Sequence, residues 1–193
     1  MSGFATSAKS FAELPADCVA RVRAGDVAAF EALYRVMHAP LHGFASRYVG
    51  DDARAEELVQ ELFLDLWVER ASWTVHSSVR AYLFSAARNR ALNVQRRDTV
   101  ERDWSSDEGL DDVRALHPRP SRADAEMERA ELLERLDRAL ASLPERCALV
   151  MRLRWREQMS YAEIADVLDI SVKGVENQLG RGLRALRERM GMN

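Results

Sequence analysis

The fold is decided by one stretch of the chain, SYAEIADVLDISVKGVENQLGRGLRALRERM, which covers residues 160–190. The stretch begins with Ser160, and Glu163 follows three residues later, which is the pattern of a capping box at the start of a helix. One face at helical spacing comes next, made of Tyr161, Ile164, Ala165 and Leu168. The tripeptide DIS (169–171) then forms a short turn, and its Ser171 can cap a second helix. The stretch therefore predicts a helix-turn-helix.

The second helix of this pair is expected to bury one face and to expose the other. The expected buried face consists of Val172, Val175, Leu179, Leu183 and Leu186. The outward positions, together with the cap, are Ser171, Lys173, Glu176, Asn177, Gly180, Arg181 and Arg184. Polar side chains of this kind can contact base edges or phosphates in a major groove. An ordinary helical hairpin with a solvated charged face is the alternative.

Three glycines and an acid are unusual in a helix that binds DNA. Each of Gly174, Gly180 and Gly182 costs a helix interior roughly 1 kcal/mol relative to Ala. We expect Gly180 to let the backbone approach the groove, and Gly174 and Gly182 to permit close contacts between helices. Glu176 repels phosphate, but it can accept a hydrogen bond from a cytosine amino group. The pattern favours selectivity at some cost in affinity.

A second basic stretch covers residues 78–97, which contain five arginines and no acidic residue. Aromatic and amide side chains are interleaved with the arginines or lie in the loop before them: Trp73, His76, Tyr82, Phe84, Asn89 and Asn93. Basic residues give affinity for phosphate, and aromatic rings stack with unpaired bases. A solvated arginine-rich helix with aromatic core residues explains the pattern as well. This stretch alone leaves both interpretations open.

The clearest helix is predicted for residues 52–69. Its apolar stripe follows helical spacing and consists of Ala55, Leu58, Val59, Leu62, Phe63 and Leu66. A second face combines Glu61, Leu64, Asp65 and Val68, so that apolar groups lie among acids. This face suits docking to a basic protein helix. A second core contact for Leu64 and Val68 is the alternative, and the sequence does not decide between them.

The rest of the chain also follows helical periodicity, without an alternating strand pattern. Asp26 is expected to cap a helix that ends before Pro40. Residues 98–130 hold five basic and ten acidic residues, and the periodicity is lost there. We therefore expect an all-α fold with two small helical domains at 14–97 and 129–191. An acidic linker at 98–128 joins them, and the second domain contains the helix-turn-helix.

Several function classes are not expected from this sequence. Cys18 and Cys147 lack partners at metal-ligand spacing and are expected to be buried thiols. His38 and His42 are four residues apart, but Pro40 between them argues against a helical metal pair. We find no glycine-rich phosphate loop and no acid/base pair, so we expect no catalysis, metal, cofactor or small-molecule substrate. The chain also lacks a secretory signal pattern and an apolar run of roughly 18 residues, so we expect a cytoplasmic protein without membrane insertion.

Taken together, these motifs resemble a known family. The stretches AAFEALYRVMHAPLHGFASRYVGDDARAEELVQELFLDLW (28–67) and VRAYLFSAARNRALNVQRRD (79–98) resemble domain two of bacterial RNA polymerase sigma factors. Residues 136–188, with their Leu-Pro and Ser-Tyr-Ala-Glu-Ile-Ala motifs, resemble domain four. Two such domains with only a linker between them are similar to the extracytoplasmic-function (ECF) group.

The resemblance implies a role for each of three surfaces. In this family the acidic helix docks on the clamp coiled coil of the largest polymerase subunit, which implies core contacts for Gln60, Glu61, Leu64, Asp65 and Trp67. The next segment captures the non-template strand of the −10 promoter element. This implies −10 contacts for Trp73, His76, Arg80, Tyr82, Arg88, Asn89, Asn93, Arg96 and Arg97. The outward residues of the helix-turn-helix would read the −35 element, and the linker would thread toward the RNA exit path.

The sequence also departs from the commonest pattern of the family. It has Asp169 in the turn where the family often has Gly. It has Gly174 where Thr is common, and Glu176 where a basic residue is common. The promoter sequence therefore cannot be carried over from relatives.

The expected protein is thus an ECF-type sigma factor that binds core RNA polymerase and promoter DNA and is not itself an enzyme. The resemblance further implies an anti-sigma partner. A stand-alone helix-turn-helix regulator, whose amino-terminal half senses a signal or dimerises, is the main alternative. A helical adaptor without DNA binding is a third possibility. A regulator binds duplex DNA alone, whereas a sigma factor needs core enzyme.

Overall fold

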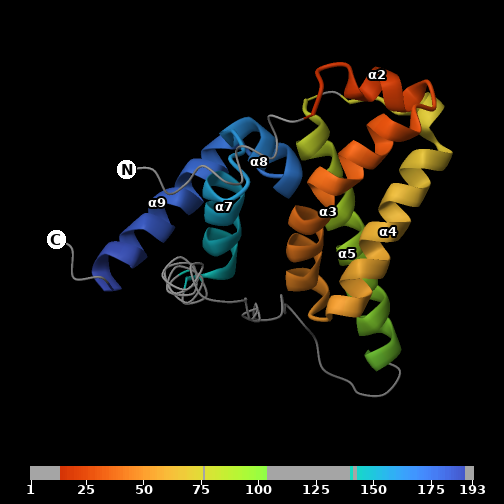
Figure 1. Cartoon of the computed structure of the whole chain (residues 1–193). Coiled ribbons are helices and arrows are strands. Elements are labelled where there is room, and N and C mark those ends of the chain that lie inside the picture. The colour runs from red at the N-terminus through yellow and green to blue at the C-terminus, as the bar shows by residue number, and fades with distance from the viewer. Residues whose placement is uncertain (1–13, 76, 104–139, 141–142, 190–193) are drawn as a thin grey trace, which may run out of the picture.

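The computed structural model of the chain describes residues 14–75, 77–103, 140 and 143–189. Every regular element within these residues is a helix, which confirms the expected all-α fold. Helices α2 (Cys18–Arg23), α3 (Val27–Val49), α4 (Asp52–Val68) and α5 (Val79–Asp103) form one group with the short 3-10 helix η1 (Arg70–Ser72). Helices α7 (Glu145–Trp155), α8 (Tyr161–Leu168) and α9 (Val172–Arg189) form a second group (Figure 1). No described helix is both long and apolar enough to cross a membrane.

Helix α3 is continuous, which corrects the expectation of an end before Pro40. Asp26 caps it as expected, because its carboxylate accepts a hydrogen bond from the amide of Ala29 at 3.1 Å. Pro40 removes one backbone donor from the helix. Met37 and Leu41 on either side of the proline are fully buried, and this packing holds the helix together across it. The helix ends at Val49 and is capped by Gly50, whose φ of 68° is left-handed.

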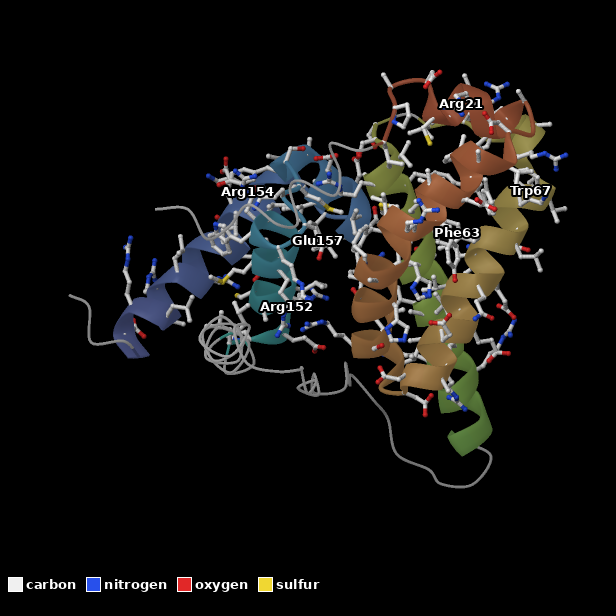
Figure 2. All side chains as sticks on the ribbon, in the orientation of Figure 1. Arg21, Phe63, Trp67, Arg152, Arg154 and Glu157 are labelled. Carbon is white, nitrogen blue, oxygen red and sulfur yellow. The ribbon has the colours of Figure 1, made fainter. Side chains whose placement is uncertain are left out.

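Helix α4 buries the predicted stripe against its neighbours. All six of its residues are buried: Ala55, Leu58, Val59, Leu62, Phe63 and Leu66. Asp51 caps the helix by accepting a hydrogen bond from the amide of Arg54 at 2.8 Å. Phe63 lies between α4 and α3 (Figure 2). Its ring meets those of Phe30 and Tyr34 of α3 edge-on, with centroids 6.0 and 4.8 Å away. Helices α3, α4 and α5 thus enclose one core.

Helices α8 and α9 form the predicted helix-turn-helix. The Ser160 hydroxyl accepts a hydrogen bond from the amide of Glu163 at 3.2 Å, and the Glu163 carboxylate accepts one from the amide of Ser160 at 2.8 Å. The turn follows at Asp169, whose φ of 54° lies in the left-handed region, where Asp is more common than most residues. Ser171 then caps α9 by accepting a hydrogen bond from the amide of Gly174 at 3.0 Å.

The buried face of α9 differs in part from the predicted one. Val175 and Leu179 are buried and Leu186 is half-buried, but Val172 and Leu183 are 44% and 38% exposed. The prediction was therefore wrong at these two positions. The buried stripe runs through residue 182, one position before Leu183, so that Leu183 is turned about 100° away from the contact with α7.

The two groups of helices contact each other where α5 meets α8. Helix α5 itself extends to Asp103, so the first six residues of the predicted linker, 98–103, are helical. The remainder of that linker lies outside the described residues. The domain boundaries given above stay a prediction.

Candidate nucleic-acid and polymerase interfaces

Helix α9 presents the predicted −35 residues on one exposed surface. All seven are exposed: Ser171, Lys173, Glu176, Asn177, Gly180, Arg181 and Arg184. The ammonium group of Lys173 lies 2.9 Å from a carboxylate oxygen of Glu176. An exposed pair of this kind contributes at most about 1 kcal/mol, so either side chain can exchange its partner for a base or a phosphate.

The three glycines of α9 have different surroundings. A Cβ atom at Gly180 would have no neighbour within 4 Å, so this position leaves the outer surface bare. A Cβ atom at Gly182 would overlap the sulfur of Met151 in α7, and this confirms a close helix contact there. A Cβ atom at Gly174 would lie 3.6 Å from Ile170, which belongs to the turn rather than to another helix. Gly180 alone among the three suits an approach to a groove.

The loop before α5 borders a cavity of about 150 Å³ between the end of α4 and the start of α5. Trp73 and Tyr82 line the cavity, with their ring centroids 5.9 Å apart. Tyr82 is 40% exposed, whereas Trp73 is 4% exposed. The indole Nε1 of Trp73 is buried and has no hydrogen-bond partner among the described residues. Tyr82 thus offers an open ring for stacking, while Trp73 forms the wall behind it. His76 lies outside the described residues.

The remaining predicted −10 residues divide into two sets along α5. Asn89, Asn93, Arg96 and Arg97 are exposed. Arg80 and Arg88 are half-buried instead: Arg80 donates a hydrogen bond to the carbonyl of Glu157, and Arg88 contacts the hydroxyl of Tyr48. Burial raises the pKa of Tyr48 to about 12, although the charge of Arg88 opposes this rise. The four exposed side chains form the surface that is open to a polyanion.

Helix α4 turns an apolar and acidic surface to solvent. Leu64 and Val68 are 63% and 67% exposed, so the alternative of a second core contact does not hold within the described residues. Gln60, Glu61 and Asp65 are exposed beside them. Large apolar side chains without cover, surrounded by acids, are typical of a surface that binds another protein.

Neighbouring helices fix the rim of this surface. The ring of Trp67 is half-buried, with its centroid 4.8 Å from that of Phe30 in α3. Val27, one helical turn before Phe30, is 55% exposed and was missed by the sequence analysis. It adds an exposed apolar side chain at the start of α3, one helical turn from the ring that contacts Trp67. Asp65 accepts a hydrogen bond at 2.6 Å from Arg90 of α5, so it also links two helices.

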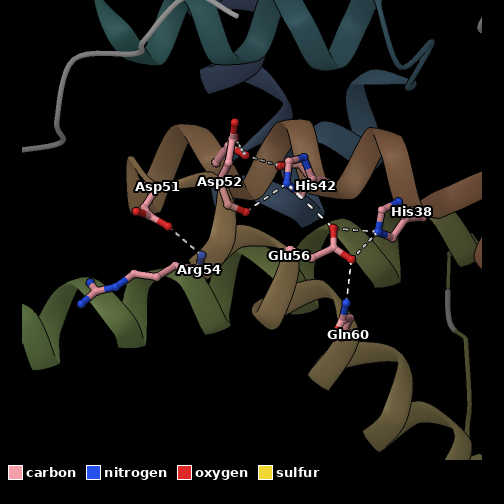
Figure 3. A network of polar contacts seen from close by, with 8 residues as sticks. His38, His42, Asp51, Asp52, Arg54, Glu56 and Gln60 are labelled. Carbon is pink, nitrogen blue, oxygen red and sulfur yellow. Dashed lines mark hydrogen bonds and ion pairs between the residues drawn. The ribbon is translucent and has the colours of Figure 1, made fainter.

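A polar network joins α3 to α4 through two histidines (Figure 3). His38 Nε2 lies 3.0 Å from both carboxylate oxygens of Glu56, which also accepts a hydrogen bond from Gln60 at 2.8 Å. The hydrogen bond with His38 is the main reason why the pKa of Glu56 is lowered, and Gln60 adds to it. Because α3 continues through Pro40, His38 and His42 share one helix, and the proline does not separate them as the argument against a helical metal pair assumed. No group suited to a metal ion is found among the described residues.

Sequence reasoning missed the contact between the two helix groups, although it assigned other roles to Arg80 and Glu163. Ser78 donates a hydrogen bond to Glu163 at 2.5 Å, and the backbone carbonyl of Glu157 accepts one from Arg80. The carboxyl group of Glu157 is buried here, which raises its pKa, although Arg156, Arg80 and Arg47 oppose the rise. These partners are 85 and 77 residues apart, and no local pattern marks them.

Comparisons with known proteins agree with this geometry. Sigma-70 region 2 matches residues 33–100, and Sigma-70 region 4 matches residues 133–186. The ECF RNA polymerase sigma factor SigF of Caulobacter vibrioides is 30% identical over 167 residues, which cover 86% of this chain and 88% of that protein. The ECF RNA polymerase sigma factor SigW of Bacillus subtilis is 22% identical over 176 residues, which cover 89% and 94%.

Solved structures show the same fold. The structure of CnrH in complex with the cytosolic domain of CnrY has a TM-score of 0.60 at 23% identity, covering 91% of this chain and 96% of that one. The sigma factor RpoE of Bartonella quintana, in complex with the anti-sigma factor NepR, has a TM-score of 0.59 at 21% identity. It covers 85% of this chain and 98% of its own.

The fold and the exposed faces define a two-part helical protein that carries a DNA-binding helix-turn-helix. The match to SigF shows the family, and the chain belongs to the ECF RNA polymerase sigma factors. It therefore acts with core RNA polymerase in promoter-specific transcription initiation.

Proposed function

We propose that three separate faces divide the work of this sigma factor. The exposed surface of α4 binds the core enzyme, the loop before α5 and the exposed side of α5 hold the opened −10 strand, and α9 reads the −35 element. The observation that carries this assignment is the chemical difference between the faces. The face of α4 is apolar and acidic. The face of α5 is basic, with amide side chains and the exposed ring of Tyr82, and the face of α9 is polar and includes Gly180.

The core-binding role of α4 is supported by Leu64 and Val68, whose burial against a partner would remove apolar area from water. Glu61 beside them attracts a basic partner helix. Asp65 contributes less to this attraction, because Arg90 already neutralises it. We therefore expect the strongest contact with core enzyme at Leu64, whose exposed apolar side chain lies beside Glu61 on this face.

The −10 role is supported by the cavity next to Tyr82 and by the exposed Asn89, Asn93, Arg96 and Arg97 further along α5. A base can stack on the tyrosine only after it has left the duplex, so the site binds the open state and not the closed one. Differential binding of this kind drives strand opening without a catalytic reaction of the protein's own. Trp73 supports the loop from behind, and Arg88 orients the helix through Tyr48.

The −35 role is supported by the exposed polar surface of α9. Arg181 and Arg184 suit phosphates, while Glu176 suits a cytosine amino group and disfavours other bases. Lys173 compensates part of the repulsion between Glu176 and the phosphate backbone. Gly180 suits a close approach of the helix backbone.

The organisation of the chain completes the proposal. Domain two spans 14–97, the linker 98–128 and domain four 129–191, and the protein works in the cytoplasm. An anti-sigma partner is proposed because a relative of the same fold, RpoE, is found in complex with one.

Run-off transcription tests the proposed function. Core RNA polymerase is given a pool of genomic fragments with and without the protein, and promoter-dependent products are expected only when it is present. Asn89→Ala should then reduce open complexes on a duplex template and also weaken binding to a pre-melted template, because its proposed contact is with the opened strand. Open complexes equal to those of the unmodified protein would remove Asn89 from the −10 site, and the lack of any product would refute the proposed function.

A further inference from the structure

A carboxylate of domain four lies at the start of α5 in domain two. The Ser78 hydroxyl accepts a hydrogen bond from the amide of Ala81 at 3.1 Å, and it donates one to Oε1 of Glu163 at 2.5 Å. One side chain therefore caps α5 and binds an anion at the same time. The amino end of this long helix carries the positive end of the helix dipole, which favours an anion there.

Arg80 adds a positive charge to the same place. Burial lowers the pKa of its guanidinium, while the charges of Glu163 and Glu157 counter that effect. Burial on its own raises the pKa of Glu163, but hydrogen bonds from Ser78 and Ser160, together with Arg80, bring it below the ordinary value. Glu163 is thus held as an anion at neutral pH.

A hydroxyl, a helix amino terminus and a guanidinium are also the groups that bind phosphate in proteins. These three groups directly follow the loop to which the opened −10 strand is assigned. We infer that Ser78, Arg80 and the start of α5 bind a backbone phosphate of the opened strand, and that Glu163 occupies this site as an internal anion in the free chain. The phosphate half of this inference rests on the proposed function.

The two anions exclude each other because both need the Ser78 hydroxyl, and both draw on the nearby charge of Arg80. Glu163 is also the third residue of α8, and its other carboxylate oxygen closes the capping box, so its bond to Ser78 ties the start of the helix-turn-helix to α5. When a phosphate takes its place, α8 separates from α5 and domain four becomes free to reach its own promoter element. One anion replaces another, and the exchange couples DNA binding to domain separation.

Three variants separate the parts of this device. Ser78→Asp and Ser78→Asn both keep a good helix cap. Ser78→Asp adds a negative charge that repels Glu163 and phosphate alike, whereas Ser78→Asn is its uncharged control. Glu163→Gln keeps the capping box, because Gln serves there as well as Glu. It removes only the charge of the internal anion.

The internal anion is tested on the free protein by distances between spin labels on cysteines introduced at Glu57 and Asn177, which are exposed on α4 and α9. The two native cysteines are buried. We expect a short distance in the unmodified protein. Ser78→Asp and Glu163→Gln should each raise the ratio of open to closed molecules about tenfold, as the loss of a charged hydrogen bond predicts. Ser78→Asn should change it far less. If the distances were unchanged in both Ser78→Asp and Glu163→Gln, Glu163 would not act as an internal anion that closes the free protein.

The phosphate half is tested with holoenzyme and a promoter fragment whose −10 non-template strand is single. Ser78→Asp should weaken binding about tenfold, Ser78→Asn only slightly, and Glu163→Gln not at all. In a second series, one backbone phosphate of the single strand is replaced by an uncharged methylphosphonate. At one position this replacement should weaken binding of the unmodified protein, but it should not further weaken binding of the Ser78→Asp variant. If every position weakens both proteins equally, the phosphate site is refuted. A protein that directs no transcription refutes the proposed function instead, and the distance measurement still decides the internal anion.

Discussion

Helices α4 and α9 both turn a face away from the core, and the two faces suit different partners. On α4, Leu64 and Val68 stand uncovered next to each other among acids, which makes an apolar surface for a protein. On α9 the outward surface combines charges and an amide with the bare Gly180, which suits a nucleic-acid groove. Exposure is therefore informative only together with the chemistry of the neighbouring positions.

Their inner faces differ as well. The buried stripe of α4 consists of full-sized apolar side chains, with Ala55 as the small exception. The stripe of α9 passes through Gly182, where the sulfur of Met151 fills the space that a side chain would need. Helix α4 is thus held by interlocking side chains, whereas α9 combines the buried Val175 and Leu179 with a close approach of its backbone to α7 at Gly182.

The largest expected effect tests the outer face of α4. Leu64→Arg should weaken binding to core polymerase by about 2 kcal/mol or more, because it places a charge at the centre of an apolar contact. Leu64→Met, which keeps apolar volume, is the control and should bind nearly as well. Titration of labelled protein with core enzyme measures both. The free energy of unfolding should stay unchanged because the side chain is exposed. Equal affinity of both variants would remove Leu64 from the interface.

The next effect concerns the inner face of α9. Gly182→Ala should lower the free energy of unfolding by about 1–3 kcal/mol, because the added methyl group forces Met151 out of place. Gly180→Ala meets no neighbour and should raise stability by up to about 1 kcal/mol through helix propensity. Urea unfolding followed by circular dichroism measures both. If Gly182→Ala were also stabilising, the close contact with α7 would not be the reason for the glycine.

A smaller effect concerns the outer face of α9. Glu176→Ala should reduce discrimination at one −35 base pair by about 1 kcal/mol while changing overall affinity little. Lys173→Ala should instead weaken all promoter sequences alike and lower the salt dependence of binding. Competition among −35 variants for holoenzyme distinguishes these outcomes. A uniform loss of affinity with Glu176→Ala would assign it a structural role.

The smallest effect lies between α3 and α4. Because the pKa of Glu56 is lowered in the folded protein, its contribution to stability is present above the ordinary glutamate pKa and declines as pH falls through the lowered value. Glu56→Gln should cost less than about 1 kcal/mol at neutral pH, since this partly exposed pair is screened by solvent. The difference in the free energy of unfolding between Glu56→Gln and the unmodified protein should become smaller below about pH 5, which unfolding experiments at several pH values would measure. A difference that stays constant down to pH 3 would contradict it.

How far the sequence predicted the fold depends on whether a signal was local. The capping box of Ser160 and Glu163 and the stripe of α4 arise within a few residues, and both were predicted correctly. Pro40 shows the limit of local rules, because the burial of Met37 and Leu41 outweighs the lost backbone hydrogen bond. Leu183 shows a second limit. The buried stripe of α9 passes through Gly182, which the apolar pattern does not include, and Leu183 one residue later is exposed instead.

The candidate sites follow the same division. The outward residues of α9 were predicted from helical spacing alone, and the structure finds them exposed together. Arg80 and Trp73 were assigned by position in a family and prove half-buried and buried, because tertiary contacts decide their surroundings. The second role of Glu163 depends on a partner 85 residues away, which no window of sequence could reveal.

That separation also has a meaning in time. A ribosome adds about 5–20 residues per second, so Glu163 is synthesised roughly 4–17 seconds after Ser78. In the part of this interval after Asp103 has been added, α5 is complete in sequence and the carboxylate of Glu163 is still absent. Each newly made copy of the protein thus passes through a brief period in which domain two has been synthesised but Glu163, its partner in domain four, has not.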